Sequence, residues 1–236
     1  MSYSNSKAPT GFDRFGLNKT LLRGIDAAGF DSPRPIQSET IPAGLAGHDV
    51  LGLAQTGTGK TAAFALPLLD RLLRNGKQGP RALILAPTRE LANQIANEIR
   101  TLSRFTRLEM VTIYGGVSAH NQVQTLRHKK PEIVVGCPGR VLDLLEQGVL
   151  RLDRIETLVL DEADHMFDMG FLPDIRKIMR PLPAHRQNLL FSATMPREVR
   201  RLADDLLRNP HVVELADAAP AATIDHALVM VAEQRK

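Results

Sequence analysis

The chain has 236 residues, 43% of them hydrophobic, which is enough to bury one sizeable core in a single domain. Its formal net charge of +4 is compatible with a polyanionic partner, and its single cysteine, Cys137, excludes an internal disulfide and indicates a reducing compartment. Segment 1–9 lacks the apolar core of a signal peptide, and no apolar run approaches the ~20 residues that span a membrane. These features predict a cytoplasmic protein with no membrane partner.

Strands and helices are predicted to alternate along most of the chain. Short apolar runs indicate buried strands, and apolar residues at helical spacing indicate helices between them. Repeated strand–helix units predict an α/β fold in which a mainly parallel sheet is covered by helices on both faces. The predicted strands are 50–54, 81–86, 109–114, 132–136, 155–160, 187–191 and 211–215, and the predicted helices are 61–69, 88–103, 119–127, 139–147, 173–180 and 196–208.

A glycine-rich loop joins the first predicted strand to the first predicted helix. A loop of this kind turns backbone N–H groups towards an anion at the positive end of the helix. Lys60 is predicted to reach the β- and γ-phosphates of a nucleotide, and Thr61 to offer its hydroxyl to magnesium. The strict pattern begins with Gly, whereas this loop begins with Ala54; a chance glycine-rich turn is the alternative. The loop reads Ala54-Gln55-Thr56-Gly57-Thr58-Gly59-Lys60-Thr61.

An acidic segment, Asp161-Glu162-Ala163-Asp164, directly follows the apolar strand 155–160. Carboxylates at the carboxyl end of a core strand, on the same edge as a phosphate-binding loop, suit metal binding and water activation. Asp161 is predicted to hold Mg²⁺, partly through water, and Glu162 to orient or deprotonate the attacking water. The two residues and Lys60 are the predicted catalytic groups. Taken alone, the segment is equally compatible with a solvated acidic turn.

The motif Asp-Glu-Ala-Asp and the segments around it resemble the DEAD-box RNA helicases. The resemblance runs from Phe12 to Leu215 and is strongest to the bacterial RhlE-type proteins. It implies a RecA-like P-loop domain over 12–216, with ATP and Mg²⁺ as cofactors and RNA as the partner. In order, the matching segments are Gly29–Gln37 (Q motif, with Phe12 upstream), Pro87–Ala92 (motif Ia), Gly115–Gly116 (the GG element), Cys137–Arg140 (motif Ib) and Ser192–Thr194 (motif III).

The Q-motif residues Phe12, Phe30, Arg34 and Gln37 are assigned by this resemblance to nucleotide binding. Gln37 carries a donor and an acceptor, so it can read the adenine edge, which predicts ATP over GTP. Phe30 is expected to stack on the base, and Phe12 to pack against the same segment. Prolines on both sides of Arg34 are expected to stiffen a loop that presents Gln37. Ordinary core packing is the alternative for either Phe.

RNA binding is assigned by the resemblance to residues of motifs Ia and Ib and of the GG element. Helix starts and arginines suit phosphate oxygens, and glycines allow a close approach of backbone to a nucleic-acid strand. None of these groups reads a base edge, so binding is predicted to be independent of sequence. Cys137 replaces the threonine usual in motif Ib. The predicted RNA-binding residues are Pro87, Thr88, Arg89, Gly115, Gly116, Pro138, Gly139 and Arg140.

Motif III is implied to couple ATP hydrolysis to strand separation. Ser192 and Thr194 are expected to form hydrogen bonds towards the acidic segment, with Asp164 as the third member of this coupling group. Capping of the helix that begins near Pro196 stays open as an alternative for Thr194. His165 is expected to be solvated or locally satisfied.

The chain is predicted to be the N-terminal half of a helicase. Residues 1–11 are expected to form a flexible tail, 217–223 an interdomain linker, and 224–231 the first strand of a second RecA-like domain. No H-R-x-G-R-x-x-R run, which would carry the arginine finger, occurs in the sequence, so little hydrolysis is expected of this chain alone. The alternatives are another class of P-loop ATPase, a DNA helicase of the same superfamily, and a non-catalytic clamp.

Overall fold

The computed structural model describes residues 11–74, 76 and 79–215. In this part of the chain, seven strands form one sheet in the order β3-β4-β2-β5-β6-β1-β7, and every neighbouring pair is parallel. The predicted α/β architecture is thereby confirmed. The strands are β1 (Val50–Leu53), β2 (Ala82–Leu85), β3 (Met110–Ile113), β4 (Ile133–Gly136), β5 (Thr157–Leu160), β6 (Gln187–Ser192) and β7 (His211–Glu214).

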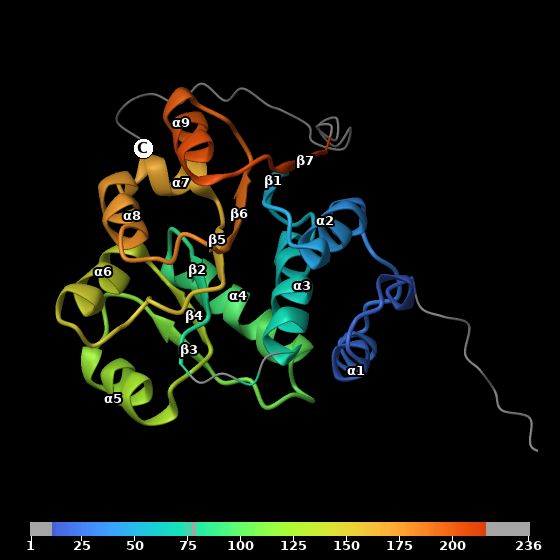
Figure 1. Ribbon diagram of the computed structural model, residues 1–236, viewed down its shortest axis with the longest axis horizontal. Helices are drawn as coiled ribbons and strands as arrows, with labels where there is room; N and C mark the ends of the chain where they lie inside the picture. Colours follow the sequence, from blue (N-terminus) through green and yellow to red (C-terminus); the bar gives the residue numbers. More distant parts are fainter. Residues whose placement is uncertain (1–10, 75, 77–78, 216–236) are drawn as a thin grey trace, which may run out of the picture.

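Helices cover both faces of this sheet (Figure 1). The apolar core on one face includes residues of α1–α4, with α1 packed on α3 and α4, and the core on the other face includes residues of α5–α9. The helices are α1 (Lys19–Ala27), α2 (Pro35–Ala46), α3 (Lys60–Arg74), α4 (Arg89–Leu102), α5 (Ala119–Lys129), α6 (Pro138–Glu146), α7 (Ala163–Asp168), α8 (Leu172–Met179) and α9 (Arg197–Leu206), with a short 3₁₀ turn, η1, at Asp13–Phe15.

Strand β2 shows why the central strands are largely apolar. Ala82 and Ile84 belong to the core on the α1–α4 side, whereas Leu83 and Leu85 belong to the core on the α5–α9 side. Successive side chains of a strand point to opposite faces, so a strand buried on both sides carries apolar residues on both faces.

The strand order separates the predicted motifs into two groups. Because all strands are parallel, their carboxyl ends lie along one edge of the sheet. The strands β1, β6 and β5 are neighbours, and they carry the glycine-rich loop, motif III and the acidic segment. The strands β2, β4 and β3 are also neighbours, and they carry motifs Ia and Ib and the GG element. The predicted nucleotide and RNA residues therefore occupy adjacent halves of the same edge.

The structure corrects the expectation that a stiff loop presents Gln37. Gln37 lies in the first turn of α2, and Pro35 is the first residue of that helix. The fixed φ of proline and its missing N–H suit that position, so this proline starts a helix and does not stiffen a loop.

Several predictions fall outside the described residues. They concern the tail up to residue 10, the linker 217–223 and the strand 224–231. No helix in the described ranges is both long and apolar enough to pass through a lipid bilayer.

Candidate nucleotide site and nucleic-acid surface

A cavity of about 480 Å³ lies at the carboxyl end of β1, where the glycine-rich loop meets the acidic segment. Most of the predicted nucleotide-binding residues line it, together with Asp161 and Glu162. The lining residues are Phe30, Arg34, Gln37, Thr56, Gly57, Gly59, Lys60, Thr61, Leu91, Gln94, Glu98, Asp161 and Glu162.

The glycine-rich loop has the backbone conformation that a phosphate cradle needs. Gly57 and Gly59 have φ values of 81° and 94°, in the left-handed region that favours glycine. The Thr58 hydroxyl donates a hydrogen bond to the Gln55 carbonyl at 2.8 Å, which fixes the loop internally. Lys60 is the first residue of α3. The first backbone N–H groups of this helix have no partner within the helix, and they lie at the glycine-rich loop, where an anion can bind them.

The Q-motif residues brace this loop. The Gln37 amide donates to the Gly59 carbonyl at 3.1 Å and accepts the Arg34 backbone N–H at 2.9 Å. The Arg34 guanidinium donates to the Gly57 carbonyl at 2.6 Å. A Cβ on Gly59 would lie 2.6 Å from Gln37 Nε2, so a larger residue would disturb the contact. A glutamine amide has two N–H groups and two lone pairs, so one of each is left for an adenine edge.

The two Q-motif aromatics differ in position. Phe30 is partly exposed and lines the cavity, as expected for a ring that stacks on a base. Phe12 is fully buried and meets Phe30 edge-on, with ring centroids 6.2 Å apart, and it does not line the cavity. Phe12 therefore supports Phe30 by packing and has no direct path to a nucleotide.

Three further loop residues, Ala54, Gln55 and Thr58, also lie outside the cavity lining. Gln55 is one of the residues that accept hydrogen bonds within the loop. The Ala54 carbonyl accepts a hydrogen bond from the Lys60 ammonium at 3.1 Å. These residues therefore stabilise the shape of the loop and do not line the cavity.

Lys60 and Asp161 form a buried pair at the base of the cavity. Their side chains are 5% and 3% exposed, and Lys60 Nζ lies 3.7 Å from Asp161 Oδ1. Burial raises the pKa of Asp161 to about 6, although the Lys60 charge opposes this shift. Buried groups with a strongly shifted pKa in a cleft are found preferentially at functional sites, which makes this pair a candidate for ligand binding.

Glu162 has a left-handed backbone, with a φ of 53°. A non-glycine residue in that region is strained, and such strain is commonly found at functional sites. The residue lines the cavity and occupies the N-cap position of α7, where its side chain forms no capping hydrogen bond. His165 lies 3.4 Å from its carboxylate and is exposed, in agreement with a locally satisfied histidine.

Asp164 connects the acidic segment to motif III. Its carboxylate accepts hydrogen bonds from the Thr194 backbone N–H at 2.9 Å and from the Thr194 hydroxyl at 2.8 Å. The Asp164 N–H in turn donates to the Ser192 hydroxyl at 3.2 Å, and that hydroxyl donates to the Thr194 carbonyl at 2.7 Å. The expected contact is present. The capping alternative for Thr194 is wrong, because Pro196 occupies the N-cap position of α9.

Motifs Ia and Ib converge on the GG element. The Thr88 hydroxyl caps α4 by accepting the Leu91 N–H at 3.2 Å, and Pro138 is the first residue of α6.

Two arginines lie near the glycine pair. The exposed Arg89 guanidinium is close to Gly116, because a Cβ added to that glycine would lie 3.5 Å from it. Arg140 donates to the Val117 carbonyl over 3.4 Å, directly after Gly115 and Gly116. A Cβ added to Gly139, between Pro138 and Arg140, would lie 4.0 Å from the Phe171 ring. The Arg89 and Arg140 side chains, from the first turns of two helices, thus both reach the loop of the glycine pair.

Sequence reasoning missed three residues of the nucleotide cavity, namely Leu91, Gln94 and Glu98. All three belong to α4 and lie at helical spacing on one side of it. Gln94 and Glu98 lie beside the apolar residues whose helical spacing predicts this helix. This polar pair next to the apolar side is the sequence feature that could have pointed to them. No motif contains Glu98.

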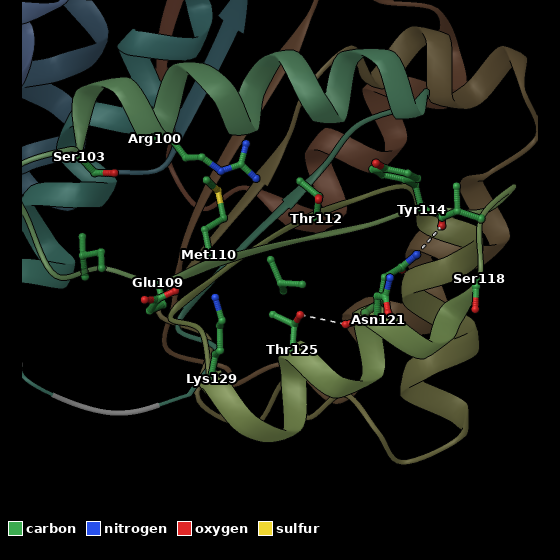
Figure 2. Close-up of a pocket in the computed structure, with 14 residues that line it drawn as sticks. Arg100, Ser103, Glu109, Met110, Thr112, Tyr114, Ser118, Asn121, Thr125 and Lys129 are labelled. Carbon is green, nitrogen blue, oxygen red and sulfur yellow. Dashed lines mark hydrogen bonds between the residues drawn. The ribbon is translucent and has the colours of Figure 1, made fainter.

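A second hollow of about 600 Å³ lies along the edge strand β3, between α4 and α5 (Figure 2). Figure 2 shows Tyr114 and Ser118 towards one end, and Glu109 and Lys129 towards the other. Although larger, it lacks a buried lysine–carboxylate pair and a glycine-rich loop, so the smaller cavity is the better nucleotide site.

Comparison with known proteins identifies the family of the chain. The family model described as DEAD/DEAH box helicase matches residues 34–202. The chain belongs to this family. It is 45% identical over 228 residues to the ATP-dependent RNA helicase CshA of Listeria monocytogenes, a match that covers 96% of this chain and 44% of the relative. The Bacillus cereus DEAD-box ATP-dependent RNA helicase CshA is 44% identical, with 96% and 43% covered.

Solved structures show the same fold. The crystal structure of a DEAD box protein from Methanococcus jannaschii matches with a TM-score of 0.82 and 41% identity, covering 86% of this chain and 55% of that one. A hypothetical ATP-dependent RNA helicase from Sulfolobus tokodaii matches with a TM-score of 0.78 and 38% identity, covering 84% and 57%. The chain spans about half the length of the relatives it matches. The finer resemblance to RhlE-type proteins stays a prediction.

Proposed function

We propose that this chain is the ATP-binding, RNA-contacting N-terminal half of a cytoplasmic DEAD-box RNA helicase. The buried Lys60–Asp161 pair at the base of the glycine-rich loop is the observation that carries the proposal. The ammonium can meet phosphate oxygens, and the carboxylate is an oxygen ligand of the kind that Mg²⁺ prefers. The relatives whose names include ATP-dependent RNA helicase support the same function.

The cavity residues fit a nucleotide with its cation. Thr61 and Asp161 supply the hard oxygen ligands that Mg²⁺ prefers. No group of three or more His, Cys, Asp and Glu side chains suited to a metal occurs in the described ranges, so phosphate and water oxygens would complete the coordination. When bound, the cation neutralises charge that develops on the β- and γ-phosphates. Lys60 would contact the same phosphates, and Glu162 would orient or deprotonate the attacking water.

The nucleic-acid surface fits a single-stranded phosphate backbone. Arg89 and Arg140 lie beside the starts of α4 and α6, where backbone N–H groups and arginines can meet phosphate oxygens. In the intact protein, ATP and RNA would bring a second RecA-like domain against this edge, bend one RNA strand and open a short duplex. Hydrolysis would then separate the domains and release the RNA.

Nucleotide binding by this chain tests the proposal. Isothermal titration with ATP, ADP and GTP should give tighter binding of ATP than of GTP, because Gln37 matches adenine. Lys60→Ala should weaken ATP binding at least tenfold. Lys177→Ala, an exposed lysine on α8, is the control and should leave binding unchanged. Equal binding of GTP and ATP would overturn adenine reading by Gln37, and unchanged ATP binding by Lys60→Ala would overturn the cavity assignment.

A further inference from the structure

The hollow beside β3 exposes one edge of the sheet. In the described part of the chain, β3 is the last strand in the sheet order and pairs with β4 alone. The carbonyls of Glu109 and Ile113 accept hydrogen bonds from N–H groups of β4 and its flanking residues. Successive residues of a strand direct their backbone groups to opposite sides, so the N–H and C=O groups of Met110 and Thr112 point away from β4 and towards the hollow. A further strand could pair with them there.

Gln122 of α5 covers the next outward-facing carbonyl along this edge, that of Tyr114. Its side-chain amide donates to this carbonyl at 3.1 Å, as the N–H of an added strand would do. The Gln122 side chain is 7% exposed and lines the hollow, yet its Oε1 atom has no hydrogen-bond partner among the described residues. Because a buried acceptor without a donor is unfavourable, a ligand that brings an N–H group to this end of the hollow would be stabilised.

Two cations face each other across the same edge. Figure 2 shows Arg100 of α4 and Lys129 of α5 pointing into the hollow from opposite sides of β3. Arg100 donates to the Asn97 side chain on its own helix at 2.7 Å, and neither cation forms an ion pair with a described residue. Of the described residues that line the hollow, Glu109 is the only acidic one. The excess positive charge therefore favours an acidic ligand.

We infer that this hollow binds an extended, acidic segment of a partner protein, which adds a strand beside β3. Strand addition of this kind takes its affinity from main-chain hydrogen bonds. A peptide supplies N–H and C=O groups alternately, as Met110 and Thr112 require, whereas phosphate oxygens only accept hydrogen bonds and would leave both carbonyls unpaired. A second copy of this chain would bring the same two cations against Arg100 and Lys129. The peptide therefore fits this edge better than an RNA backbone or a second copy does.

Amide hydrogen exchange, measured by NMR on the chain, tests strand addition residue by residue. The probe is a synthetic peptide of six alternating valines and threonines with two aspartates at each end, so that either strand direction places acidic residues beside the cations. At saturating peptide, exchange at Met110 and Thr112 should slow at least about tenfold, because these N–H groups gain acceptors. Exchange at Val111 and Ile113, whose backbone groups face β4, should change little.

Two altered peptides separate strand pairing from simple charge attraction. The first carries an N-methyl group on every valine and threonine, so it keeps the charge but has no N–H groups to donate there. The second has lysines in place of the aspartates and therefore the opposite charge. Neither should slow exchange at Met110 or Thr112.

Charge variants of the chain test the two cations. Arg100→Glu and Lys129→Glu should each raise the Kd of the aspartate peptide by about fivefold, measured by fluorescence anisotropy at low salt. Lys177→Glu, at an exposed lysine of α8, is the matched control and should bind as wild type does. Glu109→Gln should lower the Kd by about twofold, whereas Glu146→Gln, at an exposed glutamate of α6, should leave it unchanged. Thermal unfolding checks that each variant is folded.

Three outcomes would overturn the inference. Unchanged exchange at Met110 and Thr112 with the aspartate peptide would exclude an added strand, and equal binding of the N-methylated peptide would reduce the contact to charge attraction. Single-stranded RNA that slows exchange at these two residues, when the peptide does not, would assign the hollow to the nucleic-acid surface that begins at the neighbouring glycine pair.

Discussion

Glu162 is the residue on which the proposed chemistry depends most. In a full-length protein carrying this domain, Glu162→Gln should reduce ATP turnover at least about 100-fold, because an amide of the same size cannot take a proton from water. Nucleotide binding should be kept, since Lys60 and Asp161 are unchanged. Phosphate release and ATP titration measure the two properties, with Glu146→Gln as a control. Turnover close to wild type would reject Glu162 as the water-activating group.

Cys137 allows a test of burial at a single residue. The side chain is 9% exposed, and burial raises the pKa of its thiol from 9.0 to about 11, helped by the Glu90 charge. Only the thiolate reacts with iodoacetamide, so alkylation of the folded chain at pH 8 should be roughly 100-fold slower than for an ordinary thiol. The rate should rise about tenfold per pH unit until the pH approaches 11. Denaturant should restore fast labelling. Rapid alkylation of the folded protein at pH 8 would contradict the buried position.

The hydrogen bonds between α7 and motif III lead to a prediction about how the stability of the protein depends on pH. Burial alone would raise the pKa of Asp164, but hydrogen bonds from the Thr194 hydroxyl and N–H outweigh it, so the pKa lies below the ordinary value of 3.8. A carboxylate with a lowered pKa contributes stability above pH 3.8, and this contribution is lost as the pH falls through the native value.

Thr194→Val removes the hydroxyl bond and keeps the shape of the side chain. At pH 7 it should lower the free energy of unfolding by about 1 kcal/mol, the usual net value of one hydrogen bond. The difference from wild type should shrink as the pH falls below 3.8, because Asp164 then becomes protonated in both proteins. Urea unfolding at several pH values measures this. A difference that does not depend on pH would show that the hydroxyl acts without Asp164.

Three helices show where sequence patterns fail to predict secondary structure. Helix α1 contains Gly24, a weak helix former, because a Cβ there would collide with the Leu102 carbonyl of α4. Helix α2 contains Pro42, which normally interrupts helices, and α7 has only six residues. In these three helices, the local sequence does not favour a helix, and tertiary packing stabilises the helix nevertheless. A local sequence pattern contains no information on that packing. The strand–helix units, by contrast, are long and regular, so the parallel sheet was predictable.

The same distinction applies to the nucleotide site. The loop residues Lys60 and Thr61 were predictable, because consecutive residues of one loop stay together in any fold. Glu98 was not, because its place in the cavity depends on how α4 packs against the start of α3. The strand order is what brings the loops after β1, β5 and β6 to one place, and local spacing in the sequence does not determine it.

At the scale of the whole molecule, the cavity offers groups for only part of the proposed reaction. Lys60, Asp161 and Glu162 can bind the phosphates, the cation and the water. The sequence contains no H-R-x-G-R-x-x-R run, which in this family carries an arginine finger, and such a finger is worth about 10³- to 10⁵-fold in rate in P-loop enzymes. The curated relatives are about twice as long as the match to this chain.

We therefore expect this chain alone to bind ATP but to hydrolyse it at a rate close to background. The measurement is phosphate release from ATP by the chain, by the chain with single-stranded RNA, and by the chain with DNA of the same sequence. Background rates in all three would agree with a site completed by a second domain, because the cavity residues can bind the nucleotide but include no arginine finger for the transferring phosphate. Turnover raised by RNA and not by DNA would identify the ligand class, and it would also mean that these residues catalyse hydrolysis without a second domain. Equal stimulation by DNA would favour a DNA helicase, since the contacts proposed for Arg89, Arg140 and the glycine pair are to a backbone that both nucleic acids share.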